Sequence, residues 1–445
     1  MDVMYTQCAG LDVHKKTVVA CRMRTGGTGE VKHETQTFGT TTGELLGLVD
    51  WLTAWDVSHV AMESTGDYWK PIYNLLEGNG EVWLVNAKHV KNVPGRKTDV
   101  QDAEWLAELL RHGLLRRSFI PPQVQRDWRD LTRYRTRVVR ERTRLVNRVQ
   151  KLLEGANIKL SSVATDIFGT SGRAILAALA TGETDAAMMA ELARGLLRKK
   201  LPELEQALTG LVRPHHRFLL AQQLKHIDFL DAQIATLSQE VERQMAAASC
   251  ERIALPASEG SARHTPGSPD PVPGEPLSSK EAVVFLDSIP GVNQRTAEVI
   301  VAELGTDMRR FPTANHAAAW AGVAPGNHES AGKRYTGKTR DGNQALQDAL
   351  CEAAWAASRT KNTYLSALYR RLVGRRGTKR AIVAVAHSIL VSAYHMLSRH
   401  EAYQDLGVHH FDERKKESVV NRLIHRLEQL GVRVAIEPRS VPALG

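Results

Sequence analysis

Four acidic residues near the start of the chain could act together on a phosphate. Asp99 and Asp102 lie three residues apart at the start of Val100 to Arg111, a stretch whose apolar residues recur at helical spacing. Both carboxylates therefore face the same side of the predicted helix. Paired carboxylates repel each other unless a cation lies between them, and a hard divalent ion is the usual one. The helix dipole alone also favours an acidic pair in a first turn, so this spacing leaves both explanations open.

The other two acids stand inside predicted strands. Asp12 lies within the apolar run Cys8 to Val13, and Glu63 ends the apolar run that starts at His59. A carboxylate in a strand is disfavoured by propensity and by burial, so both positions suggest a function. Further strands are predicted at Thr17 to Cys21 and at Glu81 to Val85. Together these elements predict an N-terminal α/β domain.

The order of these elements resembles the RuvC-like branch of the ribonuclease-H fold. A strand with Asp12 is followed by two strands, a helix, a strand with Glu63, a helix, a strand, and the helix with Asp-x-x-Asp. The resemblance implies that Asp12, Glu63, Asp99 and Asp102 form an acidic quartet. In that fold such a quartet gathers around two magnesium ions, which bracket a phosphodiester.

Length, charge and cysteine usage restrict the class of protein. A chain of 445 residues with 42% apolar residues is long enough for two to four globular domains, and a net charge of +10 favours a polyanionic partner. The cysteines, Cys8, Cys21, Cys250 and Cys351, form no C-x-x-C pair, which predicts neither a zinc site nor a disulfide framework. No apolar run approaches the roughly 18 residues of a spanning helix, and no signal peptide is recognisable. We therefore expect a cytoplasmic protein with no membrane partner, associated with the nucleoid when it acts on DNA.

A basic helix is predicted from Arg126 to Lys151, where ten Lys or Arg residues stand against three Asp or Glu. Its apolar seam repeats every seven residues at Leu131, Val138, Leu145 and Leu152, and a second seam follows at Leu220, Ile227, Ile234 and Val241. These seams predict a coiled coil, either as an antiparallel hairpin or across a dimer. The candidate contacts to RNA phosphates are Arg133, Arg137, Arg140 and Arg144. A solvated charged face is the alternative.

A linker rich in Pro, Gly and Ser is predicted at residues 257–279. After it, the turn from Ile289 to Asn293 precedes a helical pattern from Arg295 to Leu304 and resembles a helix-hairpin-helix, whose turn points N–H groups at a DNA phosphate. Asn293 stands where that motif has its second glycine, and because Asn tolerates left-handed conformations the turn can be kept. An ordinary turn between helices is the alternative.

A Gly-rich polar segment from Ala321 to Asn343 precedes a predicted helix from Gln344 to Ser358. It offers a serine hydroxyl, Ser330, and its positive charges could hold phosphates at Lys333, Arg334, Lys338 and Arg340. A second basic loop, with Lys88, Lys91, Arg96 and Lys97, precedes the acidic pair. No general base accompanies Ser330 locally, so a hydrolase triad is poorly supported.

Taken in order, these motifs resemble one family. They are the acidic quartet, the basic helices, the Ile-Pro-Gly turn, the Ala-Pro-Gly-Asn-His-Glu-Ser-Ala-Gly-Lys-Arg loop and the tail Tyr403-Gln404-Asp405-Leu406-Gly407. The family is the insertion-sequence transposases that join a RuvC-like DEDD domain to a serine-bearing transposase domain, also described as bridge-RNA-guided recombinases and related to Piv-type invertases.

The resemblance implies that the quartet binds magnesium, about two ions per site, and that Ser330 forms a covalent phosphoserine link to DNA. It also implies a structured guide RNA that pairs with donor and target DNA, and dimers that assemble into a tetramer in which one protomer's serine completes another's acidic site. The domains expected are a RuvC-like domain at 1–120, a basic coiled-coil domain at 121–256, the linker at 257–279, a mainly helical transposase domain at 280–400 and a tail at 401–445.

Two other functions remain compatible with the same residues. One is a structure-selective nuclease of the Holliday-junction type, in which the quartet activates water and Ser330 is only a loop residue. The other is an RNA-binding protein that keeps the fold without catalysis. DNA that stays attached to the denatured protein would distinguish the recombinase from both.

Overall fold

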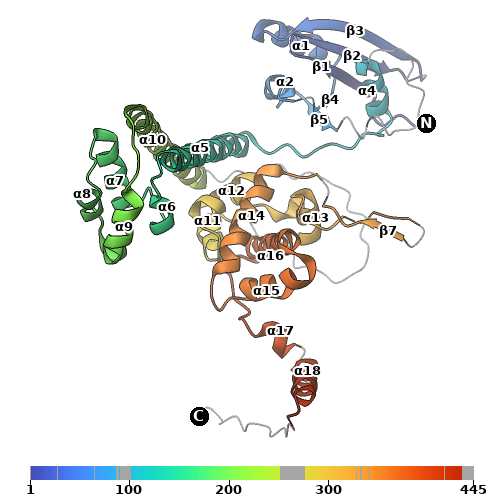
Figure 1. Cartoon of the computed structure of the whole chain (residues 1–445). Helices are drawn as coiled ribbons and strands as arrows, with labels where there is room; N and C mark the ends of the chain where they lie inside the picture. Colours follow the sequence, from blue (N-terminus) through green and yellow to red (C-terminus); the bar gives the residue numbers. More distant parts are fainter. Residues whose placement is uncertain are drawn as a thin grey trace. The chain divides into compact units, whose positions relative to one another are not determined.

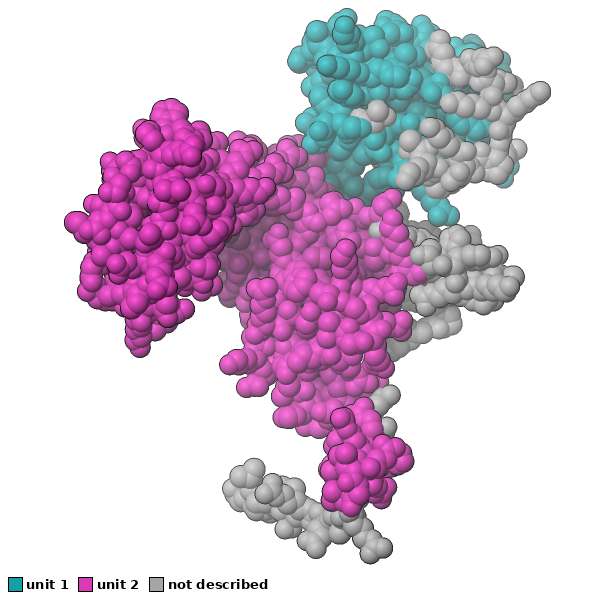
Figure 2. Space-filling view, viewed as in Figure 1, with its two compact units in different colours: residues 1–122 teal, residues 123–445 magenta. Residues whose placement is uncertain are grey.

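The chain divides into two compact units, Met1–Pro122 and Gln123–Gly445 (Figure 2). The structure is a computed structural model that describes residues 2–27, 29–64, 66–86, 90, 102–250, 276–326, 328–330, 333–339, 341–414 and 416–432. Within them, residues 328–330 and 333–336 are described by their backbone. The first unit ends two residues beyond the predicted limit of 120, and the predicted domains 121–256 and 280–400 lie in one unit.

The first unit is built on a five-stranded mixed sheet with the strand order β3-β2-β1-β4-β5 (Figure 1). Its strands are β1 Gln7–Val13, β2 Thr17–Thr25, β3 Val31–Gly39, β4 His59–Glu63 and β5 Glu81–Val85. Strands β1, β2 and β3 pair antiparallel, whereas β4 and β5 extend the sheet from β1 in parallel. The predicted α/β sheet is confirmed, and β2 continues beyond Cys21, where the predicted strand ended.

Helices cover both faces of this sheet. They are α1 Thr42–Thr53, α2 Trp69–Leu76 and α4 Asp102–Arg111. Leu48 from α1 and Ile72 from α2 pack with Leu11 on one face, while Leu106 from α4 packs with Cys8 on the other. Alternate residues of β1 therefore point into different layers, as the pleat of a strand requires.

Two long helices, α5 Gln123–Gly155 and α10 Pro214–Cys250, span the second unit. Trp128, near the start of α5, shares a core with Met245, near the end of α10. Leu153, at the end of α5, shares another core with Leu220 from the start of α10. The two helices therefore pack antiparallel against each other.

The apolar stripe of α5 departs from the predicted seven-residue seam. Val138 and Leu145 are buried as predicted, but the next buried positions are Val149 and Leu153, and Leu152 is only half-buried. A straight α-helix drifts about 20° per heptad relative to a 3.5-residue repeat, so the buried stripe moves off a strict heptad.

Short helices connect α5 to α10 and bury the second core. They are α6 Leu160–Val163, α7 Thr170–Thr181, α8 Ala186–Glu191, the 3₁₀ helix η1 Gly195–Lys200 and α9 Leu201–Leu208. Together these helices fill the chain between the two predicted apolar seams.

The C-terminal part of this unit is mainly helical and carries a small hairpin that projects from the helices (Figure 1). Its elements are α11 Ser279–Asp287, α12 Gln294–Leu304, η2 Met308–Arg310, α13 Ala314–Trp320, β6 His328–Ser330, β7 Lys333–Thr336, α14 Gln344–Arg359, α15 Tyr364–Arg376, α16 Thr378–Arg399, α17 His410–Glu413 and α18 Lys416–Gln429. Residues 257–275, which are most of the predicted linker, lie outside the described residues. A capping box at Ser278 starts α11 and so ends that linker.

The turn between α11 and α12 does not use the left-handed conformation that Asn293 could adopt. Asn293 has φ −116°, accepts a hydrogen bond from Thr296 N and caps α12, so it is not left-handed. Gly291 carries the positive φ, 89°, and a Cβ there would lie 2.8 Å from Ala357 Cβ of α14. Close packing against α14 therefore accounts for this glycine.

One helix of the described part of the chain, α16, is long and apolar enough to cross a membrane by length and composition alone, and 61% of its apolar window is buried. The expectation that no run of this kind exists was wrong. Ile389 and Leu390 of α16 are fully buried in the C-terminal core, so packing within this unit accounts for its apolar character.

Candidate functional site

Asp12 and Glu63 lie at the same end of two neighbouring strands. The parallel register of β1 and β4 pairs Gly10 with Ala61 and Leu11 with Met62, and the next residues are Asp12 and Glu63. Cys8 and Ala61 pack on the α4 face of the sheet. Since side chains alternate along a strand, Asp12 and Glu63 belong to that same face.

Helix α4 lies directly on β1 because Gly10 has no side chain. A Cβ built at Gly10 would lie 2.5 Å from Ala107 N and 2.9 Å from Leu106 Cβ, which is closer than packed atoms allow. Such close approach of a helix backbone to a strand requires glycine.

The direction of α4 brings Asp102 toward the two strand acids. Met4 N donates to the carbonyl of Arg111 at 2.9 Å, and the Cys8 thiol donates to the carbonyl of Ala107 at 3.6 Å. Farther along β1, Gly10 meets Ala103. The start of α4, where Asp102 lies, is therefore directed toward the end of β1 that carries Asp12.

Carboxylate oxygens are the ligands that magnesium prefers, so the chemistry of these side chains suits a hard divalent cation. Asp12 is half-buried, and its Oδ2 lies 3.1 Å from Nε2 of His14. Within the described ranges, no three His, Cys, Asp or Glu side chains gather closely enough to hold a metal. Asp99 and the basic loop Lys88, Lys91, Arg96 and Lys97 lie outside the described residues.

Ser330 lies on a hairpin in the second unit. The backbone register pairs Ser330 of β6 with Lys333 of β7, next to the pair of Glu329 and Arg334. At the base of the hairpin, a Cβ on Gly326 would contact the backbone of Lys338. Arg340 lies outside the described residues. The two arms are therefore in close contact where the hairpin leaves the helical body.

The segment after the hairpin is fixed by Gly342 and Asn343, which directly precede α14. A Cβ on Gly342 would lie 2.6 Å from Gly322 Cα, so only glycine fits. Asn343 caps α14 through Leu346 N and donates through Nδ2 to Glu303 at 2.7 Å. The hairpin is thus connected to α12, which carries Glu303.

Glu303 joins three parts of the second unit. Its side chain is fully buried, and Arg133 Nε and Nη2 donate to it at 2.6 and 2.9 Å. Arg129 Nε lies 3.2 Å away. Burial lowers the pKa of Arg129 to about 10, against the opposing effect of Glu303, so Arg129 stays charged at neutral pH. A buried acid in the apolar pattern of α12 was a signal for this network that the sequence analysis missed.

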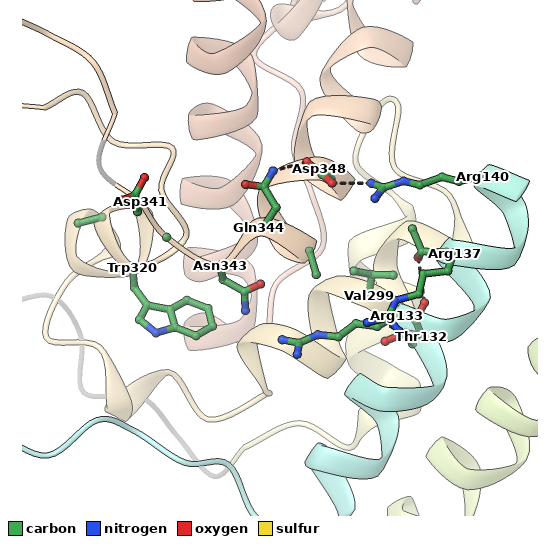
Figure 3. A pocket seen from close by; sticks show the side chains of 14 residues that line it. Thr132, Arg133, Arg137, Arg140, Val299, Trp320, Asp341, Asn343, Gln344 and Asp348 are labelled. Atoms are coloured by element: carbon green, nitrogen blue, oxygen red, sulfur yellow. Dashed lines mark hydrogen bonds and ion pairs between the residues drawn. The ribbon is translucent and has the colours of Figure 1, made fainter. Parts of the chain in front are cut away.

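Several arginines of α5 have acidic partners far away in sequence. Arg135 Nη1 lies 2.5 Å from buried Glu298, and Arg140 forms an ion pair with Asp348. Figure 3 shows Arg133, Arg137 and Arg140 projecting from α5 around a pocket of about 690 Å³ that Asn343, Gln344 and Asp348 line from the other side.

The four predicted RNA contacts therefore divide into two kinds. Arg133 and Arg140 pair with acids of this chain, whereas Arg137 and Arg144 are exposed. The count of charges along α5 missed these partners because Glu303 and Asp348 come from other helices.

Comparison with known proteins supports the same organisation. A family model described as a transposase, of the DEDD type, matches residues 9–158, and the model of the transposase IS116/IS110/IS902 family matches residues 284–370. The transposase for insertion sequence element IS1111A of Coxiella burnetii is 25% identical over 361 residues, covering 78% of this chain and 80% of that protein. A "Probable family 20 transposase" of Pseudomonas aeruginosa is 26% identical over 352 residues, covering 78% and 85%.

The two matched regions contain the acidic residues and the serine hairpin respectively. They also occur in the order in which the sequence motifs were found, with the basic helix α5 beginning inside the first region. Over both regions, the chain is therefore similar to insertion-sequence transposases of the IS116/IS110/IS902 family.

Proposed function

We propose that this transposase cuts and rejoins donor and target DNA at a composite site. Asp12, Glu63, Asp99 and Asp102 form its acidic part, and Ser330 is its nucleophile. The observation that carries the proposal is the convergence of β1, β4 and the start of α4, which supports a shared role for Asp12, Glu63 and Asp102. The second support is the hairpin that carries Ser330 within the family match.

Each part of the site has a defined chemical task. The quartet would hold two magnesium ions, which stabilise negative charge on the attacked phosphate. The Ser330 hydroxyl loses its proton and forms a bond to phosphorus, while the bond from phosphorus to the neighbouring deoxyribose oxygen breaks and that oxygen takes up a proton. Attack by a deoxyribose hydroxyl on the phosphoserine reverses these bond changes and rejoins the strands.

A structured guide RNA is the proposed partner of the long basic helix. Arg137 and Arg144 are exposed on α5, and exposed guanidinium groups on one helix are suited to a phosphate backbone. Lys333, Arg334, Lys338 and Arg340 are proposed to contact DNA near the serine. The assembly proposed is a dimer that pairs into a tetramer on two DNA duplexes.

The test is a denaturing gel of labelled element-end DNA incubated with protein, guide RNA and magnesium. Wild-type protein should yield cut DNA and a protein-DNA adduct, and Ser330→Ala should yield neither while it binds RNA normally. Asp12→Ala should also abolish cutting because the site loses a metal ligand. The matched control is Asp67→Ala, an exposed acid outside the proposed site.

Two results would contradict the proposal. Nicking by Ser330→Ala without an adduct would identify water as the nucleophile and support a junction-type nuclease. RNA binding by the wild-type protein with no cutting in magnesium would support an RNA-binding protein without catalysis.

A further inference from the structure

A cleft of about 1210 Å³ lies at the base of the serine hairpin, in the second unit. Its walls come from the segment after α13, from the segment after β7, and from α15 and α16. Lys338 lines this space, and its backbone meets that of Gly326 at the base of the hairpin. The cleft is therefore attached to the two strands that carry Ser330.

The rim of the cleft is positively charged. Arg376 at the end of α15 and Lys379 and Arg380 at the start of α16 line it, and all three are exposed. Lys338 adds a fourth positive charge from the hairpin side, and none of the described lining residues is acidic. Arg133 and Arg140 of α5 pair with acids of this chain, so the lack of acidic residues in the described lining distinguishes this rim from the Arg133 and Arg140 surface.

The wall of the cleft is apolar. Val323 and Leu372 line it together with Val383 and Ala384 on the next turn of α16. A duplex backbone held by surface charges alone would need no such wall, because phosphates and riboses remain hydrated. An apolar wall beneath a cationic rim fits a nucleobase with its phosphate.

One polar ring reaches the same space. His387 lines the cleft and is half-buried, and burial lowers its pKa below the ordinary value. At neutral pH the imidazole is therefore uncharged, with one nitrogen that donates and one that accepts a hydrogen bond. Such a ring can contact a base edge.

We propose that this cleft holds one unstacked nucleotide of the DNA strand that Ser330 cuts, with its base against Val323, Val383 and Ala384 and its phosphate against Arg376, Lys379 and Arg380. This inference rests on the proposed DNA-cutting function and adds a binding site to it. Lys333 pairs with Ser330, and Lys338 follows Lys333 by five positions. A chain of five residue steps spans at most about 18 Å. That length is about five base-pair rises, so the nucleotide lies within about five positions of the cut.

The experiment uses the full chain with its guide RNA and element-end duplexes that carry 2-aminopurine at one position each, up to five nucleotides on either side of the cut. The fluorescence of this base rises when it leaves the stack. We expect a rise at one position with the wild-type protein. Ala384→Trp should remove it by filling the cleft, and the triple change Arg376→Gln, Lys379→Gln, Arg380→Gln should remove it by releasing the phosphate.

Two control variants match these changes. Arg375→Gln removes a neighbouring exposed charge of α15, and Ala356→Trp adds the same bulk to an exposed position of α14; neither residue lines the cleft. Both should keep the wild-type rise. The triple variant should also lower the slope of log affinity against log salt by up to about one, because one phosphate contact is lost, whereas Ala384→Trp should leave this slope unchanged.

The possible failures are distinguishable. DNA cutting by the wild-type protein with no fluorescence rise at any position would overturn the nucleotide site and leave the proposed function intact. The triple variant could bind DNA more weakly while Ala384→Trp keeps the fluorescence rise. That result would show that the rim holds backbone phosphates and that no base enters the cleft. A wild-type protein that neither binds nor cuts these duplexes would overturn both proposals.

Discussion

At the scale of single residues, the buried carboxylate of Glu303 connects residues of three helices that are far apart in sequence. Its buried carboxylate accepts hydrogen bonds from Arg133 and Asn343 and lies beside Arg129. A buried ion pair that loses one partner leaves the other charge desolvated, which typically costs about 3–5 kcal/mol. The carboxylate therefore stabilises the junction of α5, α12 and α14.

Glu303→Ala should lower the free energy of local opening of α12 and α14 by about 3–5 kcal/mol, because Arg129 would stay buried without its acid. Hydrogen exchange followed by mass spectrometry measures this opening for each helix. Glu303→Gln keeps a hydrogen-bond acceptor and should therefore lower this free energy of opening by less. The control is Glu352→Ala on the exposed side of α14, with a change within about 0.5 kcal/mol. Equal exchange in all three variants would contradict a stabilising role.

At the scale of elements, the close contact of α4 with β1 decides where the acidic residues meet. A methyl group at Gly10 cannot fit against Ala107 N and Leu106 Cβ, so Gly10→Ala should displace α4 and move Asp102 away from Asp12. We expect DNA cutting to fall as far as in Asp102→Ala. Gly47→Ala is the matched control, because a Cβ at Gly47 in α1 meets nothing within 4 Å.

The displacement can be measured without any cutting assay. Burial raises the pKa of the Cys8 thiol to about 12, so little thiolate exists at pH 8 and folded protein should react slowly with iodoacetamide. Gly10→Ala should expose Cys8 and accelerate its alkylation, while Gly47→Ala should not. Slow alkylation in Gly10→Ala together with full DNA cutting would show that α4 tolerates the methyl group.

The helix α5 provides a second prediction at this scale. Arg137→Gln combined with Arg144→Gln should lower the salt slope of RNA binding by up to about two, because two phosphate contacts would be lost. Arg133→Gln should leave the slope nearly unchanged and weaken the packing of α12, since Arg133 pairs with Glu303. Binding across a range of salt concentrations measures both. A normal slope in the double variant would identify Arg137 and Arg144 as a solvated face.

At the scale of the whole molecule, the acidic residues and Ser330 belong to different compact units, so the composite site can be assembled from two protomers. Ser330→Ala mixed with Asp12→Ala should then recover part of the cutting activity, because one protomer supplies the acids and another the serine. Asp12→Ala mixed with Asp102→Ala is the control and should remain inactive, since every acidic site in that mixture lacks one ligand. Equal inactivity of both mixtures, once subunit exchange is verified, would place the whole site in one protomer.

The sequence by itself determined the local elements of the first unit. Apolar runs and the helical spacing after Asp102 predicted the bounds of β1, β4, β5 and α4 to within two residues. These elements could be predicted because alternation and helical periodicity are properties of neighbouring residues. The ordered motifs were also sufficient to indicate the transposase family.

Only the tertiary structure decided which charges have partners and which glycines are constrained by close packing. Arg133 and Glu303 are separated by 170 residues, and no periodicity or local charge count relates such distant positions. The same holds for Gly291 against α14 and for the cleft in which the segments after α13 and β7 meet α15 and α16. The physical reason is that burial and Coulomb interaction depend on distances in space, which packing sets after the local elements have formed.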